Sequence, residues 1–188
     1  KGVCLSWTEW EENAKALIQH HKLDEKTVLA TSLPTFHCNA HGLGMFTTYI
    51  TKCTLILFDK LPSNFLEILN YENVDIASVT PSILYKLVKE NPDHQFNPSF
   101  KYFLTAAAPL SAGLLEELLK KFGMKIIQGF GLSESVNFSC TLPTDIEINT
   151  DLYKKIMFPH PSVGVEIPRV KIELKNVNKE NKTGEVIV

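Results

Sequence analysis

Seven consecutive residues in the second half of the chain combine the chemical groups that bind a nucleotide. The run Q-G-F-G-L-S-E, at 128–134, directly follows the apolar segment 125–127. Its two glycines permit a close approach of the backbone to a ligand or a positive φ, and its phenylalanine offers a flat face for stacking. Its serine hydroxyl can form a hydrogen bond with a phosphate, and its carboxylate is a hard oxygen ligand for Mg²⁺. The run therefore indicates a site for a nucleotide phosphate and its metal ion.

Several of these side chains also have ordinary structural explanations. An aromatic side chain such as that of Phe130 commonly fills a hydrophobic core, and Ser133 could be only a helix cap. Glu134 could only stabilise the N-terminus of a helix by its interaction with the helix dipole. For His37, in the run L-P-T-F-H at 33–37, a structural and a functional interpretation are equally open. The pair His20–His21 at a helix end, and the terminal Lys1, are interpreted as solvated side chains.

Length and composition indicate one globular domain. The 188 residues are 44% hydrophobic and 21% charged, which permits a sizeable core and argues against disorder. The net charge of -2 argues against a nucleic-acid-binding protein, which would be expected to be basic. No apolar run approaches the ~20 residues that span a bilayer. The cytoplasm is therefore the expected compartment. The four cysteines are scattered without a C-x-x-C pair, so we expect reduced thiols and neither a zinc site nor a disulfide framework.

Segments with strand and helix patterns alternate along the first two thirds of the chain. A capping box at 6–9 opens the first predicted helix, and Thr80-Pro81 and Ser111 are helix-start signals. The apolar run 54–58 predicts a strand covered on both faces. Predicted strands lie at 27–31, 54–58, 75–79, 101–105 and 125–127, and predicted helices at 6–21, 40–50, 63–69, 80–88 and 111–122. This alternation predicts an α/β fold with a mostly parallel sheet flanked by helices.

The pattern changes after about residue 140. The stretch 141–160 reads as irregular, and 170–174 and 185–188 read as strands joined by a polar turn. We therefore divide the chain into an α/β nucleotide-binding part, 1–140, and a β-rich tail from a neighbouring subdomain, 141–188. Ligands of parallel α/β sheets bind at the carboxyl edge of the strands, so the segments 34–44, 105–111 and 128–135 are expected to meet there.

Six segments of the chain resemble motifs of one enzyme superfamily. The run at 128–134 is similar to Q-G-Y-G-x-T-E, and T-A-A-A-P-L-S at 105–111 resembles S-G-x-A-P-L-S. Residues 33–37 resemble L-P-x-F-H, 162–168 resemble S-V-G-x-P-x-P, 183–185 match T-G-E, and 1–3 resemble the tail of the phosphate loop P-K-G-V. Together they resemble the N-terminal domain of acyl-adenylate-forming (AMP-binding) enzymes, which include acyl-CoA synthetases, luciferases and peptide-synthetase adenylation domains.

The resemblance implies a role for each matching residue. Phe130 would stack on adenine, Ser133 would hydrogen-bond the α-phosphate, and Glu134 would ligate Mg²⁺. His37 would lie at the mouth of the acyl pocket, and His41 is the alternative candidate for that position. The backbone walls of the nucleotide and acyl pockets would come from Ala106, Ala107, Ala108, Gly129 and Gly131.

Two positions depart from the family pattern. Ala106 stands where the family usually has glycine, which puts close backbone approach there in doubt, and Arg169 replaces a glycine after Pro168. By the same resemblance, most of the phosphate loop would precede Lys1, and the ribose-binding aspartate, the hinge and the catalytic lysine would follow Val188. We therefore interpret the chain as a piece of a longer enzyme, and we expect the piece alone to form no acyl-adenylate.

The activity implied by the resemblance is that of an acid–thiol ligase, with ATP/AMP, Mg²⁺ and coenzyme A as cofactors. A small carboxylic acid would be activated as an acyl-adenylate and passed to CoA, since Phe36-His37 is typical of the CoA-ligase branch. Two alternatives stay open: an adenylation domain that loads a carrier protein, and a degenerate α/β module without catalysis.

Overall fold

A seven-stranded sheet forms the centre of the computed structural model, which describes residues 2–178 and 180–188. Lys1 and the interpretation given to it lie outside the described residues. The strand order is β2-β1-β3-β4-β5-β6-β7; β1 to β5 are parallel, and β6 and β7 are antiparallel. The strands are β1 Val28–Thr31, β2 Thr54–Leu57, β3 Ile76–Val79, β4 Tyr102–Thr105, β5 Lys125–Gly131, β6 Phe138–Thr141 and β7 Val165–Glu166. The expected α/β class is confirmed.

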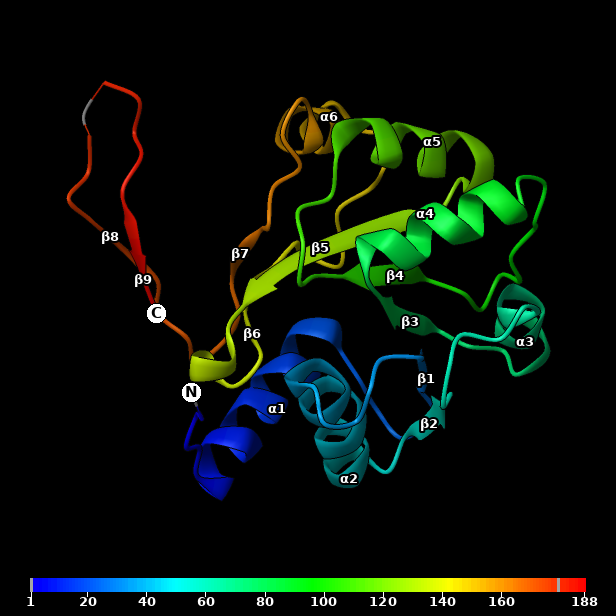
Figure 1. Ribbon diagram of the computed structural model, residues 1–188, viewed down its shortest axis with the longest axis horizontal. Coiled ribbons are helices and arrows are strands. Elements are labelled where there is room, and N and C mark those ends of the chain that lie inside the picture. Colours follow the sequence, from blue (N-terminus) through cyan, green and yellow to red (C-terminus); the bar gives the residue numbers. More distant parts are fainter. Residues whose placement is uncertain (1, 179) are drawn as a thin grey trace.

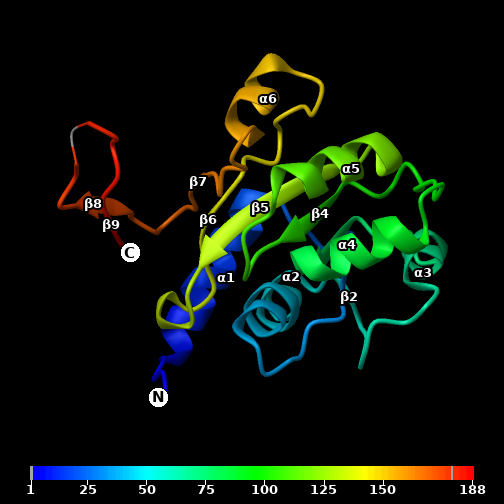
Figure 2. The same cartoon turned by 45° about the horizontal axis from the view of Figure 1, so that its top comes forward.

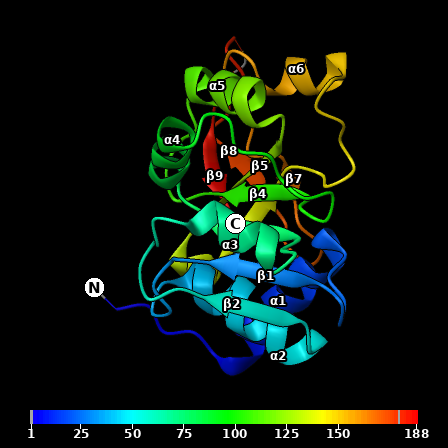
Figure 3. The same ribbon diagram turned by 90° about the vertical axis from the view of Figure 1, so that its right-hand side faces the viewer.

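Helices cover both faces of this sheet. They are α1 Trp7–His21, η1 Ala40–Phe46 (a π-helix), α2 Thr47–Thr51, α3 Phe65–Tyr71, α4 Pro81–Glu90, α5 Ala112–Phe122, the 3₁₀ turn η2 Ser133–Ser135, and α6 Asp151–Met157. From β1 the chain steps outward to β2, and from β2 onward it steps in the opposite direction to β3, β4 and β5. Because crossovers between parallel strands are right-handed, this reversal sends the connecting helices to opposite faces. Figures 1 and 3 show α1 and α2 on one face, with α4 and α5 on the other.

Local sequence signals start and stop several helices as expected. Ser6 and Glu9 form the capping box of α1, and the hydroxyl of Thr80 caps α4 ahead of Pro81. Ser111 caps α5, which ends at Gly123 in the left-handed conformation that suits glycine. The helix predicted at 63–69, for which Ser63 is the expected cap, starts later than expected: α3 begins after Asn64 and has no side-chain cap.

The core lies between the sheet and its helices. Strands β3 and β4 are buried at every position, and α5 packs into the core through Leu115, Leu118 and Phe122. The expectation that 54–58 is covered on both faces is wrong: β2 is the edge strand, with Thr54 and Leu57 exposed. A continuous apolar run cannot by itself distinguish a central strand from an edge strand.

Beyond β6 the chain adds one helix that the sequence patterns missed. Within the stretch read as irregular, α6 begins at the Thr150 cap and buries only Tyr153 and Met157, one turn apart. The tail hairpin is present: β8 Glu173–Lys175 pairs with β9 Glu185–Ile187 in a separate two-stranded sheet that stands away from the body (Figure 2). The proposed division at residue 140 stays a prediction. No helix among the described residues is long and apolar enough to cross a membrane.

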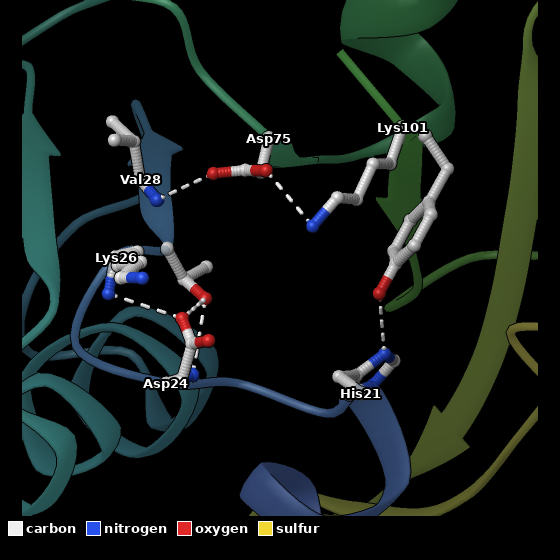
Figure 4. A network of polar contacts seen from close by, with 8 residues as sticks. His21, Asp24, Lys26, Val28, Asp75 and Lys101 are labelled. Carbon is white, nitrogen blue, oxygen red and sulfur yellow. Dashed lines mark hydrogen bonds and ion pairs between the residues drawn. The ribbon is translucent and has the colours of Figure 1, made fainter. Parts of the chain in front are cut away.

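A polar clamp ties the amino-terminal ends of three adjacent strands (Figure 4). The Asp75 carboxylate accepts a hydrogen bond from the backbone N–H of Val28 at 2.8 Å and pairs with the Lys101 ammonium at 2.9 Å. Backbone bonds from Asp75 to Val28 and from Lys101 to Asp75 run beside them. The clamp aligns β1, β3 and β4, so that their opposite ends also lie in register.

The interpretation of His20 and His21 as solvated side chains is wrong. His21 is buried, and its Nδ1 lies 3.0 Å from the hydroxyl of Tyr102 in β4 (Figure 4 labels the histidine). His20 is half-buried, with Nε2 2.6 Å from the Thr141 hydroxyl. Burial, assisted by the neighbouring His20, lowers the pKa of His21 from 6.5 to about 3, so the ring is neutral at physiological pH.

We expect Asp75→Ala to lower the free energy of unfolding by ~2 kcal/mol, because the Val28 N–H loses a charged acceptor. Asp75→Asn keeps an oxygen for that N–H and removes only a pair with an exposed lysine, so its loss should stay below ~1 kcal/mol. Denaturant titration of both variants measures the difference, and equal losses would show that the hydrogen bond does not matter.

We expect acid to destabilise the fold through His21. In the unfolded chain this ring gains a proton below pH 6.5, whereas in the folded chain it stays neutral down to about pH 3. The unfolded state therefore binds more protons in this window, and stability falls by ~1 kcal/mol per pH unit as the pH decreases. Between pH 7 and 5, the free energy of unfolding of His21→Phe should fall by ~2 kcal/mol less than that of the natural chain. Tyr102→Phe keeps the histidine, so its free energy of unfolding should depend on pH as strongly as that of the natural chain. The same slope in His21→Phe and the natural chain would contradict the assignment.

Candidate functional site

A cavity of about 470 Å³ opens where the chain reverses its direction across the sheet. After β1 the chain turns toward η1 on one face, and after the neighbouring β3 it turns toward α4 on the other. The two connections separate at the carboxyl ends of these strands, which is where open α/β sheets form a ligand crevice. The lining residues are Leu33, Pro34, His37, Cys38, Asn39, Val79, Thr80, Ala106, Ala107, Gly131, Leu132, Ser133, Glu134, Asn137 and Phe138.

The three segments expected to meet at this edge do meet there. Residues from 33–39, 106–107 and 131–134 line the same cavity, although the segments follow different strands. The register explains this: Val79 in β3 stands opposite Thr105 in β4, and Thr105 stands opposite Gln128 in β5. Each loop therefore leaves the sheet at a similar height.

His37 and His41 face different cavities. His37 lines the first, and its Nδ1 accepts a hydrogen bond from the backbone N–H of Asn39 at 3.2 Å. In the neutral ring the proton is therefore on Nε2, which makes that atom a donor. His41 lines an adjacent cavity of about 510 Å³ and packs against Trp10 in an edge-on contact with ring centroids 4.8 Å apart. Ser133 and Cys38 line both cavities, with Oγ and Sγ 4.0 Å apart.

Ser133 and Glu134 project from the short turn η2 and are exposed at the rim. The turn is held by Ser135, whose Oγ lies 2.8 Å from Oγ of the buried Ser139. It ends at Val136, whose φ of 74° is strained for a β-branched residue. Glu134 is the one carboxylate among the lining residues, and the described chain has no cluster of three or more His, Cys, Asp or Glu that could hold a metal alone.

The two glycines of the central run serve packing against β6. A Cβ on Gly131 would lie 1.6 Å from the backbone oxygen of Asn137, and a Cβ on Gly129 would lie 2.5 Å from the ring of Phe138. Neither glycine has a positive φ. Gly131 lines the cavity, whereas Gly129 is buried beneath Phe138 and does not. The glycines thus let β5 and β6 approach each other, which brings Phe138 over the sheet as a wall of the cavity.

Phe130 stands at an irregularity in the pairing of β5 with β6. It pairs with Cys140, whereas the next residue, Gly131, pairs with Phe138, because the register shifts between the two positions. The ring is half-buried, lies outside the hydrophobic core formed by the described residues, and does not line the first cavity.

The turn after β4 is strained and held by Gln128. Ala107 has a φ of 70°, which costs an L-residue about 1 kcal/mol or more. The Gln128 side chain is buried; its Oε1 accepts from the N–H of Leu110 at 2.8 Å, and its Nε2 donates to the oxygen of Pro161 at 3.0 Å. The 105–111 turn is therefore fastened to β5. Ala106 and Ala107 line the cavity, and the exposed Ala108 does not.

Sequence reasoning missed other lining residues. Thr80 is predicted only as a helix cap, yet it also directly follows β3 and lines the crevice. Cys38 and Asn39 follow the recognised L-P-T-F-H run, and Asn137 follows the turn after Glu134. Gln128 matches a motif position, but its role in holding the 105–111 turn is visible only in the folded chain. The rule that ligands bind where strands end would have pointed to Thr80; the others depend on tertiary packing.

The whole chain, residues 1–188, matches the model of the AMP-binding enzyme family. Marinolic acid–CoA ligase of Pseudoalteromonas sp. (strain SANK 73390) is 27% identical over 129 residues, which are 64% of this chain and 20% of that enzyme. 2-Succinylbenzoate–CoA ligase of Listeria monocytogenes serotype 4b (strain F2365) is 25% identical over 152 residues, 79% of this chain and 32% of that enzyme. The chain thus spans about a fifth to a third of these curated relatives.

Solved structures share the fold. O-succinylbenzoate coenzyme A synthetase from Bacillus subtilis, in complex with ATP and magnesium ion, has a TM-score of 0.80 at 22% identity over 99% of this chain and 37% of that chain. The N-terminal domain of FACL13 from Mycobacterium tuberculosis has a TM-score of 0.80 at 21% identity over 99% of this chain and 45% of that chain. Because the family model matches it from end to end, the chain belongs to the AMP-binding enzymes.

Proposed function

We propose that the protein containing this chain activates a carboxylic acid with ATP and passes the acyl group to the thiol of coenzyme A. The observation that carries the proposal is the meeting of His37, Ser133 and Glu134 at one cavity between diverging loops. The curated relatives named above are CoA ligases, which favours CoA as the acceptor. The acid, and afterwards the acyl part of the acyl-adenylate, would occupy this cavity.

The reaction has two steps. An oxygen of the acid's carboxylate attacks the α-phosphorus of ATP, and pyrophosphate leaves. The CoA thiol, as thiolate, then attacks the acyl carbonyl, and AMP leaves. Catalysis of the first step consists largely of positioning and of stabilising charge on the α-phosphate.

The lining residues suit the first step. The Nε2–H of His37 is a donor that can orient the acid's carboxylate, and the Ser133 hydroxyl can donate to an α-phosphate oxygen. Mg²⁺ would be held by Glu134 together with nucleotide oxygens, since such sites use one or two carboxylates plus phosphates, and it offsets the charge of the phosphates. A single exposed carboxylate at the rim fits that arrangement.

Phe130 supports an adenine site next to the cavity rather than in it. Its ring is half-exposed, lies outside the core formed by the described residues and does not line the cavity. The strained backbone at Ala107, held through Gln128, lies beside the same strand. We therefore assign the adenine to a site beside Phe130 and the acyl group to the cavity; Ala106, Ala107 and Gly131, which line the cavity, then form backbone walls between the two.

Experiments can distinguish the proposed CoA ligase from two alternatives. Loading of a carrier protein would share the adenylation step and differ in the acceptor, so thioester formation with CoA alone separates the two. A degenerate module would at most bind its ligands, and it would release no pyrophosphate from ATP. The acid-dependent exchange of pyrophosphate into ATP by the full-length protein tests adenylation directly, and no exchange with any acid of a broad panel would overturn the proposal.

In the full-length protein, Glu134→Gln should lower the exchange rate roughly 10²-fold and raise the Mg²⁺ concentration needed for half-maximal activity, because a metal ligand is lost. Glu116→Gln, an exposed carboxylate on α5, is the matched control and should behave like the natural protein. Full Mg²⁺-dependent activity in Glu134→Gln would show that this carboxylate does not hold the metal.

Phe130→Ala should raise KM for ATP roughly tenfold, because stacking of a base on an aromatic ring is lost. Phe130→Tyr keeps the ring and should retain the natural KM for ATP. KM for the acid should change little in either variant, since the ring does not line the cavity assigned to the acyl group. An unchanged KM for ATP in Phe130→Ala would remove the stacking role.

A further inference from the structure

A single buried residue fixes both ends of the turn after β4. Thr105, the last residue of β4, pairs with Gln128 of β5 in the sheet. Further along the turn, the backbone N–H of the buried Leu110 donates a hydrogen bond of 2.8 Å to Oε1 of the same glutamine. The backbone between these two points is short, and within it Ala107 takes up a φ of 70°, which L-residues rarely adopt.

The other end of the Gln128 amide is fixed as well. Its Nε2 donates a hydrogen bond of 3.0 Å to the backbone oxygen of Pro161, and the residue is only 3% exposed. Exchanging the two ends of the amide would set its oxygen against the Pro161 oxygen and its N–H groups against the Leu110 N–H. The amide therefore has one orientation, which its two backbone partners impose.

The turn that Gln128 holds is part of the cavity wall. Ala106 and Ala107 line the cavity, and Ala107 carries the strained φ. Strained backbone persists only where the surrounding contacts hold it. Without the bond at Leu110 the turn could relax at Ala107 to an ordinary negative φ, and this part of the wall would move.

We propose that Gln128 is a positioning residue for adenylation: it holds the turn 105–111 in the conformation that fits the acid. Gln128 is buried and is not among the described residues that line the cavity, so it acts through Ala106 and Ala107. This inference rests on the proposed function and adds to it the residue that shapes the acyl cavity. A residue that only filled the core would affect stability and leave KM for the acid unchanged.

In the full-length protein, Gln128→Met should raise KM for the acid roughly tenfold, because the turn loses its bond at Leu110. The acid is the one that gives the fastest pyrophosphate exchange in the panel described above. KM does not depend on the fraction of the enzyme that folds, so a loss of folded protein cannot imitate this effect. An unchanged KM for the acid would overturn the inference.

Gln128→Glu tests the two hydrogen bonds through pH. A protonated carboxyl keeps an oxygen for the Leu110 N–H and an O–H for the Pro161 oxygen, whereas a carboxylate sets a second acceptor against that oxygen. Burial raises the pKa of such a carboxyl above the ordinary ~4.3, into the range of the assay. The ratio of KM for the acid between this variant and the natural protein should therefore rise roughly tenfold from about pH 6 to pH 8. In Gln128→Met the same ratio should not change with pH.

The surroundings of Gln128 leave this pH range free of other titrations. Burial raises the pKa of the buried titratable side chains on the described elements β4, β6 and α6, which are Tyr102, Cys140 and Tyr153. The exposed His160, next to Pro161, is present in every variant, and Gln128→Met reports its influence separately.

Gln19→Glu is the matched control for the added carboxyl. Gln19 is exposed on α1, away from the cavity lining, so its KM ratio should stay near one at every pH. A ratio for Gln128→Glu that is as independent of pH as that of the control would show that the two hydrogen bonds do not position the turn.

The strain at Ala107 provides an independent test. Glycine adopts a positive φ without the cost that alanine carries. In a protein that carries Ala107→Gly, Gln128→Met should therefore raise KM for the acid by a factor roughly fivefold smaller than in the natural background. Equal factors in the two backgrounds would show that Gln128 does not hold the turn against this strain.

The outcomes separate this inference from the proposed function. Pyrophosphate exchange whose KM for the acid does not respond to Gln128 overturns the inference and leaves adenylation standing. A change confined to KM for ATP likewise removes Gln128 from the acyl cavity. Absence of exchange with every acid overturns both.

Discussion

The reversal of chain direction between β1 and β3 is the constraint on which the rest of the structure depends. Right-handed crossovers must carry the connection after β1 to one face and the connection after β3 to the other. Two loops that leave adjacent strands in opposite directions cannot pack on each other, and a cavity of about 470 Å³ lies between them. The residues assigned to the acid's carboxylate, the α-phosphate and the metal, which are His37, Ser133 and Glu134, all line this one opening.

The antiparallel turn from β5 to β6 completes the opening. Gly129 and Gly131 allow β6 to approach β5 so closely that Phe138 covers one glycine and the backbone of Asn137 meets the other. The intervening turn, strained at Val136, presents Ser133 and Glu134 at the rim. Strain of this kind persists only where the surrounding contacts hold it, and here the Ser135–Ser139 contact and the β5–β6 pairing do so.

The two ends of the parallel strands have different tasks. At the amino-terminal end, the Asp75 carboxylate accepts a hydrogen bond from the Val28 N–H and pairs with the Lys101 ammonium, and these contacts align the strands. At the carboxyl end, the polar side chains of His37 and Asn39 line the cavity, and each is oriented by a hydrogen bond within the protein. Groups oriented before a ligand arrives lower the ordering cost of binding, which is the physical basis for reading this edge as the site.

The amino-acid sequence by itself determined the features that depend on neighbouring residues or on general rules of α/β architecture. The helix caps at Ser6, Thr80 and Ser111, the α/β class and the convergence of three loops could all be predicted, because each depends on local spacing or on the geometry common to parallel sheets. Only the tertiary structure decided that β2 lies at the edge, that His21 is buried against Tyr102, that the glycines face β6, and that the Asn39 amide is turned by Ser78. These features depend on partners 39 or more residues away, or on which strand happens to lie alongside, and no local pattern encodes the identity of such a neighbour.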